Sequence, residues 1–301
     1  MKILLLGKNG QVGWELQRAL QPLGEVIALG RTGHENLYGD LSNLDELRRT
    51  VLSLQPDVIV NAAAYTNVDK AQCEPDLAER INSEAPKMLA KIMEQLGGWL
   101  VHFSSDYVFD GSGSHPRKEG QATGPLNVYG ESKLKGEIAI QQSGCKHLIF
   151  RTSWVYAARG ENFAKTMLRL ASERKQIKVI DDQIGAPTGA ELIADITAHC
   201  LLHASKNPQV SGLYHLAANG AVSWHGYASF VIKQARLAGN YLMVERIDVI
   251  PTLQYPTPAK RPLNSRLDCS KLHTIFGLYI PQWQIGVGRM LNTIQGHANE
   301  S

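Results

Sequence analysis

The chain opens with MKILLLGKNGQVGWEL, residues 1–16, in which a short apolar run, three glycines and the start of a helical pattern follow one another directly. This succession predicts a strand, a tight turn and a helix. Gly7 would permit the sharp exit from the strand, Gly10 a close approach of the backbone to a ligand, and Gly13 close packing of helix on strand. Amides at the start of the helix would then face an anion such as a pyrophosphate.

The spacing of these glycines is GxxGxxG, which differs from the GxGxxG of the commonest dinucleotide fingerprint. A P-loop needs a Gly-Lys-Ser/Thr sequence at its far end, whereas here Lys8 follows the first glycine. A glycine-rich turn that binds nothing is the alternative interpretation. The rest of the chain has to decide between a dinucleotide site and such a turn.

The composition is that of an ordinary globular protein. The 301 residues include 31 Lys and Arg against 28 Asp and Glu, a formal charge of +3 without a clustered basic patch, which argues against a nucleic-acid partner. No apolar stretch approaches the roughly 18 residues that span a bilayer, and no cleavable signal pattern precedes the first strand. The four cysteines form no CxxC pair, so neither a disulfide framework nor a zinc site is predicted. We expect a cytoplasmic protein without a membrane partner.

Short apolar runs that alternate with helical segments predict an α/β fold, a Rossmann-type doubly wound parallel sheet. The runs are residues 2–6, 25–29, 57–61, 99–103 and 146–151. Helices are predicted from Gln11 to Gln21, from a capping box at Ser42–Asp45 to about Leu54, and from Ser83 to Leu96. Ligands of such sheets bind beyond the carboxyl ends of the strands, so functional residues are expected there.

The looser pattern after Arg151 predicts a second, smaller domain. We assign residues 1–152 to the dinucleotide-binding domain and 153–301 mainly to a substrate-binding domain. The segments near 178–182 and 212–218 are candidates for returning to the first domain.

The stretch PTLQYPTPAKRPLNS, residues 251–265, is rich in proline and predicts an irregular loop. A surface linker is one interpretation. A loop that closes over an anionic substrate with Lys260, Arg261 and Asn264 is the other, and the sequence favours neither.

Two motifs carry the chemistry. SSDYVFDG, residues 104–111, follows the fourth apolar run, and YGESK sets Tyr129 and Lys133 on one face of a helix. Carbonyl reduction by a nicotinamide needs a hydride for the carbon and a proton for the oxygen. Tyr129 is the candidate proton donor, with Lys133 lowering the pKa of its phenol and Ser105 donating a second hydrogen bond. A half-exposed tyrosine beside a solvated lysine is the alternative, which the glycine turn makes the weaker one.

The glycine spacing, the strand-end hydroxyl and YxxxK together resemble the extended short-chain dehydrogenase/reductase family. The resemblance to sugar-nucleotide reductases of that family covers almost the whole chain, through GKNGQVGWELQRAL, PDVIVNAAAYTNVDKAQ, LNVYGESKLKGE, FRTSWVY, DDQIGAPTGAEL and YPTPAKRPLNSRLD. It implies NADPH- or NADH-dependent reduction of the C4 ketone of dTDP-4-dehydro-L-rhamnose, the last step in making dTDP-L-rhamnose for glycans such as O-antigen lipopolysaccharide.

The resemblance also implies roles for particular residues. Catalysis is expected of Tyr129, Lys133 and Ser105. Cofactor contacts are expected from Gly7, Gly10, Gln11, Val12, Gly13, Asp40, Leu41, Ala63, Ala64, Tyr65, Thr66, Tyr129 and Lys133. Substrate contacts are expected from Ser104, Ser105, Asp106, Tyr107, Trp154, Arg261 and Asn264.

The choice between the two nicotinamide cofactors depends on the end of the second strand. An NAD-specific site places an acidic residue there for the ribose 2′-hydroxyl, whereas this chain has Gly30, Arg31 and Thr32. Arg31 is expected to bind a 2′-phosphate, so the sequence favours NADPH.

Two departures from the family pattern matter. Ser104-Ser105 stands where relatives usually have Ser-Thr, so the accessory hydroxyl is a serine. In some relatives a carboxylate of the final helix joins the counterpart of Glu191 around magnesium at a dimer interface, but GRMLNTIQG here contains no acid. No metal site is therefore predicted, and a monomer and a homodimer both remain open.

Two other functions compete with this reductase. One is another sugar-nucleotide reductase or an epimerase, and the other is a non-catalytic regulator like the β subunit of methionine adenosyltransferase, which resembles this family. The intact set of Ser105, Tyr129 and Lys133 favours catalysis over regulation.

Overall fold

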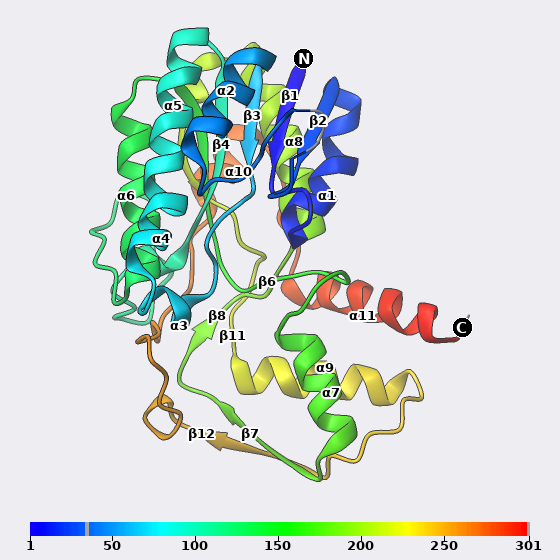
Figure 1. Ribbon diagram of the computed structural model, residues 1–301. Coiled ribbons are helices and arrows are strands. Elements are labelled where there is room, and N and C mark those ends of the chain that lie inside the picture. Colours follow the sequence, from blue (N-terminus) through cyan, green and yellow to red (C-terminus); the bar gives the residue numbers. More distant parts are fainter. Residues whose placement is uncertain (34–35, 300–301) are drawn as a thin grey trace.

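The central sheet is parallel throughout and carries helices on both faces (Figure 1). The computed structural model describes residues 1–33 and 36–299. In spatial order the strands are β10 (Gly212–His215), β5 (Lys146–Thr152), β4 (Trp99–Ser105), β3 (Val58–Asn61), β1 (Lys2–Leu6) and β2 (Glu25–Leu29). The strand order reverses between β1 and β3, the position at which doubly wound sheets bind ligands. The expected Rossmann-type fold is confirmed.

Each buried strand alternates its side chains between two cores. In β1, Ile3 and Leu5 face one core, and Leu4 and Leu6 face the other. The first core is covered by α1 (Gln11–Leu20), α8 (Ala190–Lys206) and α10 (Ser270–Phe276). The second is covered by α2 (Leu44–Leu54), α5 (Ala85–Leu96) and α6 (Val128–Gln142). Burial on both faces explains why these strands read as continuous apolar runs.

Two local expectations need correction. The cap of α2 is Asn43 rather than Ser42, because the Asn43 side chain accepts a hydrogen bond from the Glu46 amide. The helix expected from Ser83 begins earlier and irregularly, since α3 (Val68–Ala71), α4 (Pro75–Glu79) and the π-helical turn η2 (Arg80–Glu84) lead into α5. This turn contains Asn82, which is fully buried.

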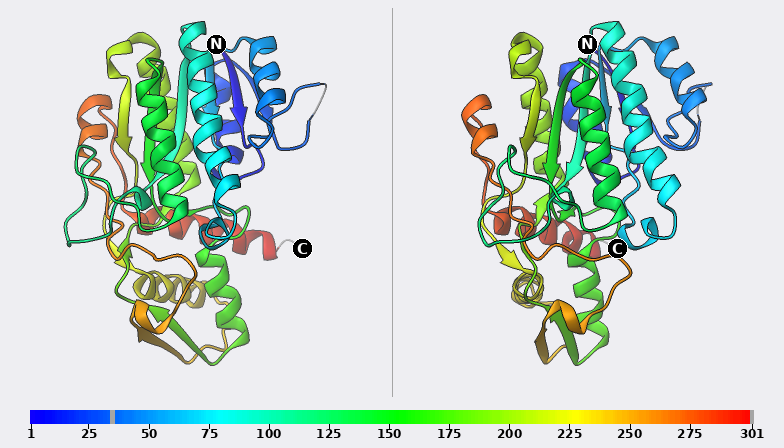
Figure 2. Two further views of the ribbon diagram at one scale, coloured as in Figure 1. Left: turned by 60° about the vertical axis from the view of Figure 1, so that its left-hand side comes forward. Right: turned by 90° about the vertical axis from the view of Figure 1, so that its left-hand side faces the viewer.

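The smaller body lies below the carboxyl ends of the sheet in Figure 1. It contains α7 (Phe163–Glu173), α9 (Trp224–Leu237) and three two-stranded pairs, which are β7 (Gln176–Ile180) with β12 (Arg246–Ile250), β8 (Ile184–Gly185) with β11 (Val222–Ser223), and β6 (Val155–Tyr156) with β9 (Thr188–Gly189). Both views in Figure 2 show α11 (Trp283–Asn299) running at the level between the two bodies.

The chain passes between the two bodies more than once. Residues 212–215 form the edge strand of the central sheet, whereas 176–180 pair with β12 in the smaller body. The domain limits drawn from the sequence stay a prediction. Within the described residues, no helix is both long and apolar enough to cross a membrane.

Candidate active site

The glycine turn between β1 and α1 has a separate physical reason for each glycine. Gly7 has a φ of +89°, and a Cβ there would lie 2.6 Å from the Ala63 nitrogen. A Cβ on Gly13 would overlap the Gly7 carbonyl oxygen. A Cβ on Gly10 would meet only that oxygen, at an ordinary 3.5 Å. Packing therefore requires Gly7 and Gly13, while Gly10 leaves space that a ligand can fill.

The start of α1 suits an anion. Gly10 is its N-cap residue and has no side chain to cap the helix, so the first-turn amides of Gln11 and Val12 are available to a phosphate. The exposed Arg31 follows β2 at the same edge of the sheet. These features fit the pyrophosphate of a dinucleotide. The Asp40 carboxylate instead accepts hydrogen bonds from the backbone and hydroxyl of Ser42, and Leu41 is buried.

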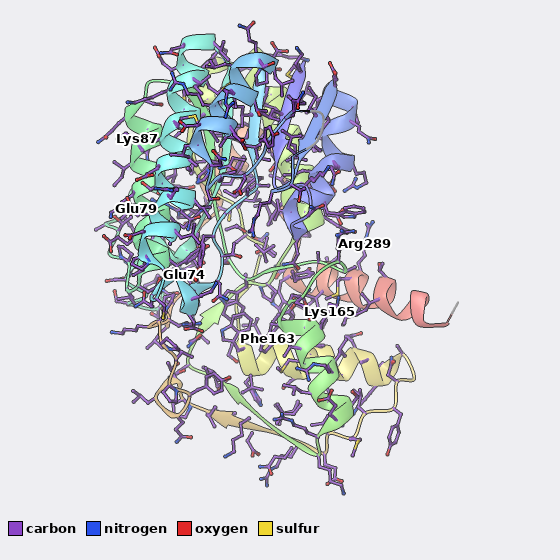
Figure 3. The ribbon with its side chains drawn as sticks, in the orientation of Figure 1. Glu74, Glu79, Lys87, Phe163, Lys165 and Arg289 are labelled. Carbon is purple, nitrogen blue, oxygen red and sulfur yellow. The ribbon has the colours of Figure 1, made fainter. Side chains whose placement is uncertain are left out.

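A loop of the smaller body reaches this turn. Asn162 donates a hydrogen bond to the Gln11 side chain at 3.3 Å, and the Arg159 guanidinium lies 3.9 Å from the centre of the Trp14 ring. Lys165, labelled at the start of α7 in Figure 3, holds the loop by bonding the Ala158 and Gly160 carbonyls. Both bodies therefore border the anion site.

The segment after β3 forms a second wall of the candidate cofactor site. It contains Ala63, Ala64, Tyr65 and the exposed Thr66. Asn82 fixes it by accepting from the Tyr65 amide at 2.9 Å and donating to the Tyr65 carbonyl at 3.0 Å. Sequence reasoning did not identify Asn82, although an asparagine on the buried face of a helix is an available signal.

Tyr129 lies at the start of α6, beside the end of β4. Burial raises the pKa of its phenol to about 12, and a hydrogen bond with the Ser105 hydroxyl lowers it in part. The ring of Tyr107 meets it edge-on, with centroids 5.6 Å apart. The structure thus places Tyr129 beside Ser105. The expected lowering of the phenol pKa by Lys133 is not found, because burial raises this pKa and the phenol stays protonated at neutral pH.

Lys133 lies one turn further along α6 and is only 2% exposed. Its ammonium donates to the Phe103 carbonyl oxygen at 2.6 Å. Burial lowers the pKa of Lys133 to about 8, against the raising effect of the Glu137 carboxylate. Glu137 is fully buried and pairs with Arg151 at 2.6 Å, a partnership that the sequence pattern did not reveal.

The end of β4 presents unpaired polar atoms. Ser104 Oγ and Asp106 Oδ2 are buried and have no hydrogen-bond partner among the described residues. The other Asp106 oxygen accepts from Ser105 at 3.1 Å, and burial raises the pKa of this carboxyl to about 6. Buried polar groups are normally paired, so these atoms are candidates for contact with a ligand.

Trp154 extends the site into the smaller body. It follows β5 with a φ of +48°, an uncommon backbone conformation for a large side chain, and stacks on Trp224 at 3.6 Å between ring centroids. Phe163, labelled in Figure 3, packs on Trp224 with 4.5 Å between the ring centroids. This aromatic surface suits a sugar ring or a base, and its Trp224 half was not predicted.

The proline-rich loop meets the first body through Arg261. Its guanidinium binds both Asp69 oxygens, at 2.6 and 2.7 Å. Asn264 is 2% exposed, and its amide donates to the Ser112 and His115 carbonyls. In this structure Asn264 orders the loop, and the substrate contacts of both residues stay predictions.

The position at which the family resemblance implied a magnesium ligand holds arginine–carboxylate pairs. Glu191 is paired at 3.2 Å with Arg289 of α11, the residue labelled beside that helix in Figure 3. Asp195 nearby is bound by Arg18 at 2.9 Å. Each of these two carboxylates therefore has an arginine partner in this structure. In the described ranges, no group of three or more metal-ligating side chains is found.

Known proteins resemble the whole chain. The family described as RmlD substrate binding domain matches residues 1–295. A dTDP-4-dehydrorhamnose reductase of Shigella flexneri is 56% identical over 295 residues, 98% of each chain. The structure of the Bacillus anthracis dTDP-4-dehydrorhamnose reductase in complex with NADP has a TM-score of 0.87 and 33% identity, covering 97% of this chain and 100% of that one. A Thermus thermophilus UDP-glucose 4-epimerase with NAD, 19% identical over 98% and 99% of the chains, shares the fold with a TM-score of 0.80.

Gly10→Ala tests whether the turn binds a ligand. The new methyl group fits the protein but enters the ligand space, so NADPH should bind at least about tenfold more weakly while the melting temperature changes little. Titration calorimetry and thermal unfolding measure the two effects. Gly120→Ala is the control, since its Cβ would lie in open space. Unchanged NADPH affinity in Gly10→Ala would mean that the cofactor lies elsewhere.

Proposed function

Because the chain belongs to the family of the RmlD substrate binding domain, together with dTDP-4-dehydrorhamnose reductases, we propose that it reduces the C4 ketone of dTDP-4-dehydro-β-L-rhamnose to dTDP-β-L-rhamnose with NADPH. The observation that carries the proposal is the pairing of Tyr129 with Ser105, one helical turn from Lys133 and at the same edge of the parallel sheet as the glycine turn. We further propose a cytoplasmic enzyme that acts as a monomer or a homodimer.

The residues of the turn and the second wall would hold the cofactor. Gly10, Gln11 and Val12 offer the anion site, and Lys133 would bind the nicotinamide ribose. A bound reduced nicotinamide supplies the hydride that reaches C4.

Tyr129 acts as the general acid. Its raised pKa keeps the proton on the phenol until negative charge develops on the ketone oxygen, when the proton passes to that oxygen. Ser105, which donates to Asp106 in the free protein, would turn its hydroxyl proton to the same oxygen, and the Lys133 ammonium stabilises the tyrosinate that forms. The phenol therefore keeps its proton in the free enzyme and gives it up only as negative charge develops on the ketone oxygen.

The sugar nucleotide would occupy the space between the two bodies. The unpaired atoms of Ser104 and Asp106 would bind sugar hydroxyls, and the Trp154 ring would contact an apolar face of the ligand. We propose that Arg261 binds the diphosphate of the substrate. Its ion pair with Asp69 fixes the position of the guanidinium.

A rate measurement tests this function. Purified protein is mixed with NADPH and dTDP-4-dehydro-L-rhamnose, and absorbance of the reduced nicotinamide is followed. We expect stoichiometric NADPH oxidation with this substrate and no net oxidation with UDP-glucose or UDP-galactose. Interconversion of the UDP-sugars without net oxidation would identify an epimerase instead. Inertness toward every sugar nucleotide would favour a regulatory protein.

Arg31→Ala should narrow the preference for NADPH over NADH. The exposed guanidinium would pair with the 2′-phosphate, and exposed ion pairs contribute about 0.2–1 kcal/mol, so the ratio of the two kcat/KM values should fall by about 1.4- to fivefold. Arg174→Ala, at an exposed position of the smaller body, controls for net charge. An equal or better kcat/KM with NADH in the unmodified protein, unaltered by Arg31→Ala, would refute this role.

A further inference from the structure

A buried chain of polar contacts links the second wall of the cofactor site to Lys133. The Ala63 amide donates to Asn61 Oδ1 at 3.2 Å, and Asn61 Nδ2 lies 3.2 Å from His102 Nδ1. On the far side of the ring, His102 Nε2 lies 3.4 Å from Lys133 Nζ. Asn61 and His102 are each 1% exposed, so solvent does not interrupt this chain.

The direction of each hydrogen bond in this chain follows from its first donor. The Ala63 N–H can only donate, so the Asn61 oxygen must face it and the Asn61 NH₂ group must face His102. An NH₂ group is also only a donor, so His102 Nδ1 carries no proton. A neutral ring then carries its proton on Nε2, the atom that faces Lys133.

An amine and an ammonium respond differently to this N–H. A neutral lysine nitrogen has a lone pair that can accept from His102 Nε2–H while donating to the Phe103 carbonyl. A lysine ammonium has no lone pair, so its charge faces the positive end of the N–H dipole. The contact therefore disfavours the protonated form of Lys133.

We propose that His102, held in one tautomer by Asn61, is a positioning residue that weakens proton binding by Lys133 in the free enzyme. The inference rests on the proposed function only in taking NADPH as the ligand that needs the Lys133 ammonium. Asn61 and His102 contact neither reacting atom, and they act through Lys133 alone.

The charges around His102 and Lys133 agree with a neutral His102 ring. Burial and the neighbouring Lys133 hold the pKa of His102 well below its usual value, so the ring is neutral. Glu137, on the same helix, is the charged group that acts on Lys133, and it is already bound by Arg151 of β5. Tyr129 is a titratable side chain of that helix, one turn before Lys133. Glu137 raises the pKa of Lys133, and burial lowers it to about 8. The proposal adds to burial the contact of His102 Nε2 with Lys133 Nζ.

NADPH binding should consequently depend on pH. Below about pH 8 Lys133 is an ammonium that can donate to the ribose hydroxyls, and above it the free enzyme holds an amine. The NADPH dissociation constant should rise as pH increases through this value. Burial of Lys133 already produces this limb, so the contribution of His102 is measured by how far the limb moves when the hydrogen bonds of His102 are changed.

The first test is the tautomer itself. Imidazole ¹⁵N–¹H correlation spectra of the unliganded protein distinguish Nε2–H from Nδ1–H, and the signals absent in His102→Gln assign the ring. We expect a neutral Nε2–H ring at pH 7. An Nδ1–H or a doubly protonated ring would overturn the proposal, whether or not the protein reduces a sugar.

The second test reverses the direction of the hydrogen bonds that link Asn61, His102 and Lys133. Asn61→Asp keeps the size of the side chain and its acceptor for Ala63, but offers an oxygen to His102 Nδ1, which then carries the proton. Nε2 becomes an acceptor for the Lys133 ammonium, so the alkaline limb of NADPH affinity should move up by about one pH unit or more, together with a change to the Nδ1–H tautomer. A limb that stays in place overturns the proposal. A limb that moves while the ring remains Nε2–H also overturns it, because the field of the new carboxylate is then the cause.

Discussion

Tyr129→Phe is expected to lower kcat by roughly 10² to 10⁴-fold, the usual contribution of a positioned general acid. The substitution removes one oxygen and leaves the ring, which meets Tyr107 edge-on, in place. The glycine turn and the second wall are untouched, so NADPH affinity should stay within about twofold of normal. Initial rates against substrate concentration and NADPH titration by fluorescence measure the two quantities separately.

Tyr279→Phe is the matched control, because Tyr279 is 72% exposed. It should leave both quantities unchanged. If Tyr129→Phe retains near-normal turnover, the proton comes from another group, and the role given to this phenol is wrong even though the family membership stands.

Lys133→Ala is expected to reduce both NADPH affinity and kcat, whereas Tyr129→Phe reduces kcat alone. Loss of the ammonium removes a donor to the cofactor ribose and the charge that stabilises the tyrosinate. We expect NADPH to bind about tenfold more weakly and kcat to fall by roughly 10²-fold or more. Because Lys133 is buried among polar groups, thermal unfolding has to show that the variant is folded before rates are compared.

Lys135→Ala provides the control from the same helix. Its ammonium is exposed and pairs with Glu79, which Figure 3 labels, and with Glu131. Surface pairs of this kind contribute little, so rate and NADPH affinity should stay near normal. A Lys133→Ala enzyme with reduced kcat but unaltered NADPH affinity would contradict the assignment of Lys133 to the ribose.

The parts of the fold that were predictable are those with a strong local pattern. Strand β1 and the turn after it were correctly expected because buried parallel strands are apolar on both faces and Gly7 must adopt a positive φ. The placement of Tyr129 and Lys133 on one face followed from helical periodicity. Each of these inferences needed only residues that are close in the sequence.

The parts that escaped prediction depend on contacts between distant residues. Asn82 holds Tyr65 across 17 positions, and Asp69 meets Arg261 across 192. The Trp154–Trp224 stack likewise joins two segments that are far apart in the sequence, and no sequence pattern predicts their contact. A polar residue within an apolar strand, such as His102 in WLVHF, is a usable signal that a buried partner exists, but the sequence does not name that partner.

The central claim is hydride transfer to C4 of the sugar, and isotope transfer tests it most directly. The enzyme is incubated with dTDP-4-dehydro-L-rhamnose and NADPH that carries deuterium at both C4 positions of the nicotinamide, and the product is analysed by NMR and mass spectrometry. The account predicts dTDP-L-rhamnose with one deuterium, at C4, for each NADPH oxidised. Product without deuterium at C4, or no product while NADPH binds normally, would contradict it.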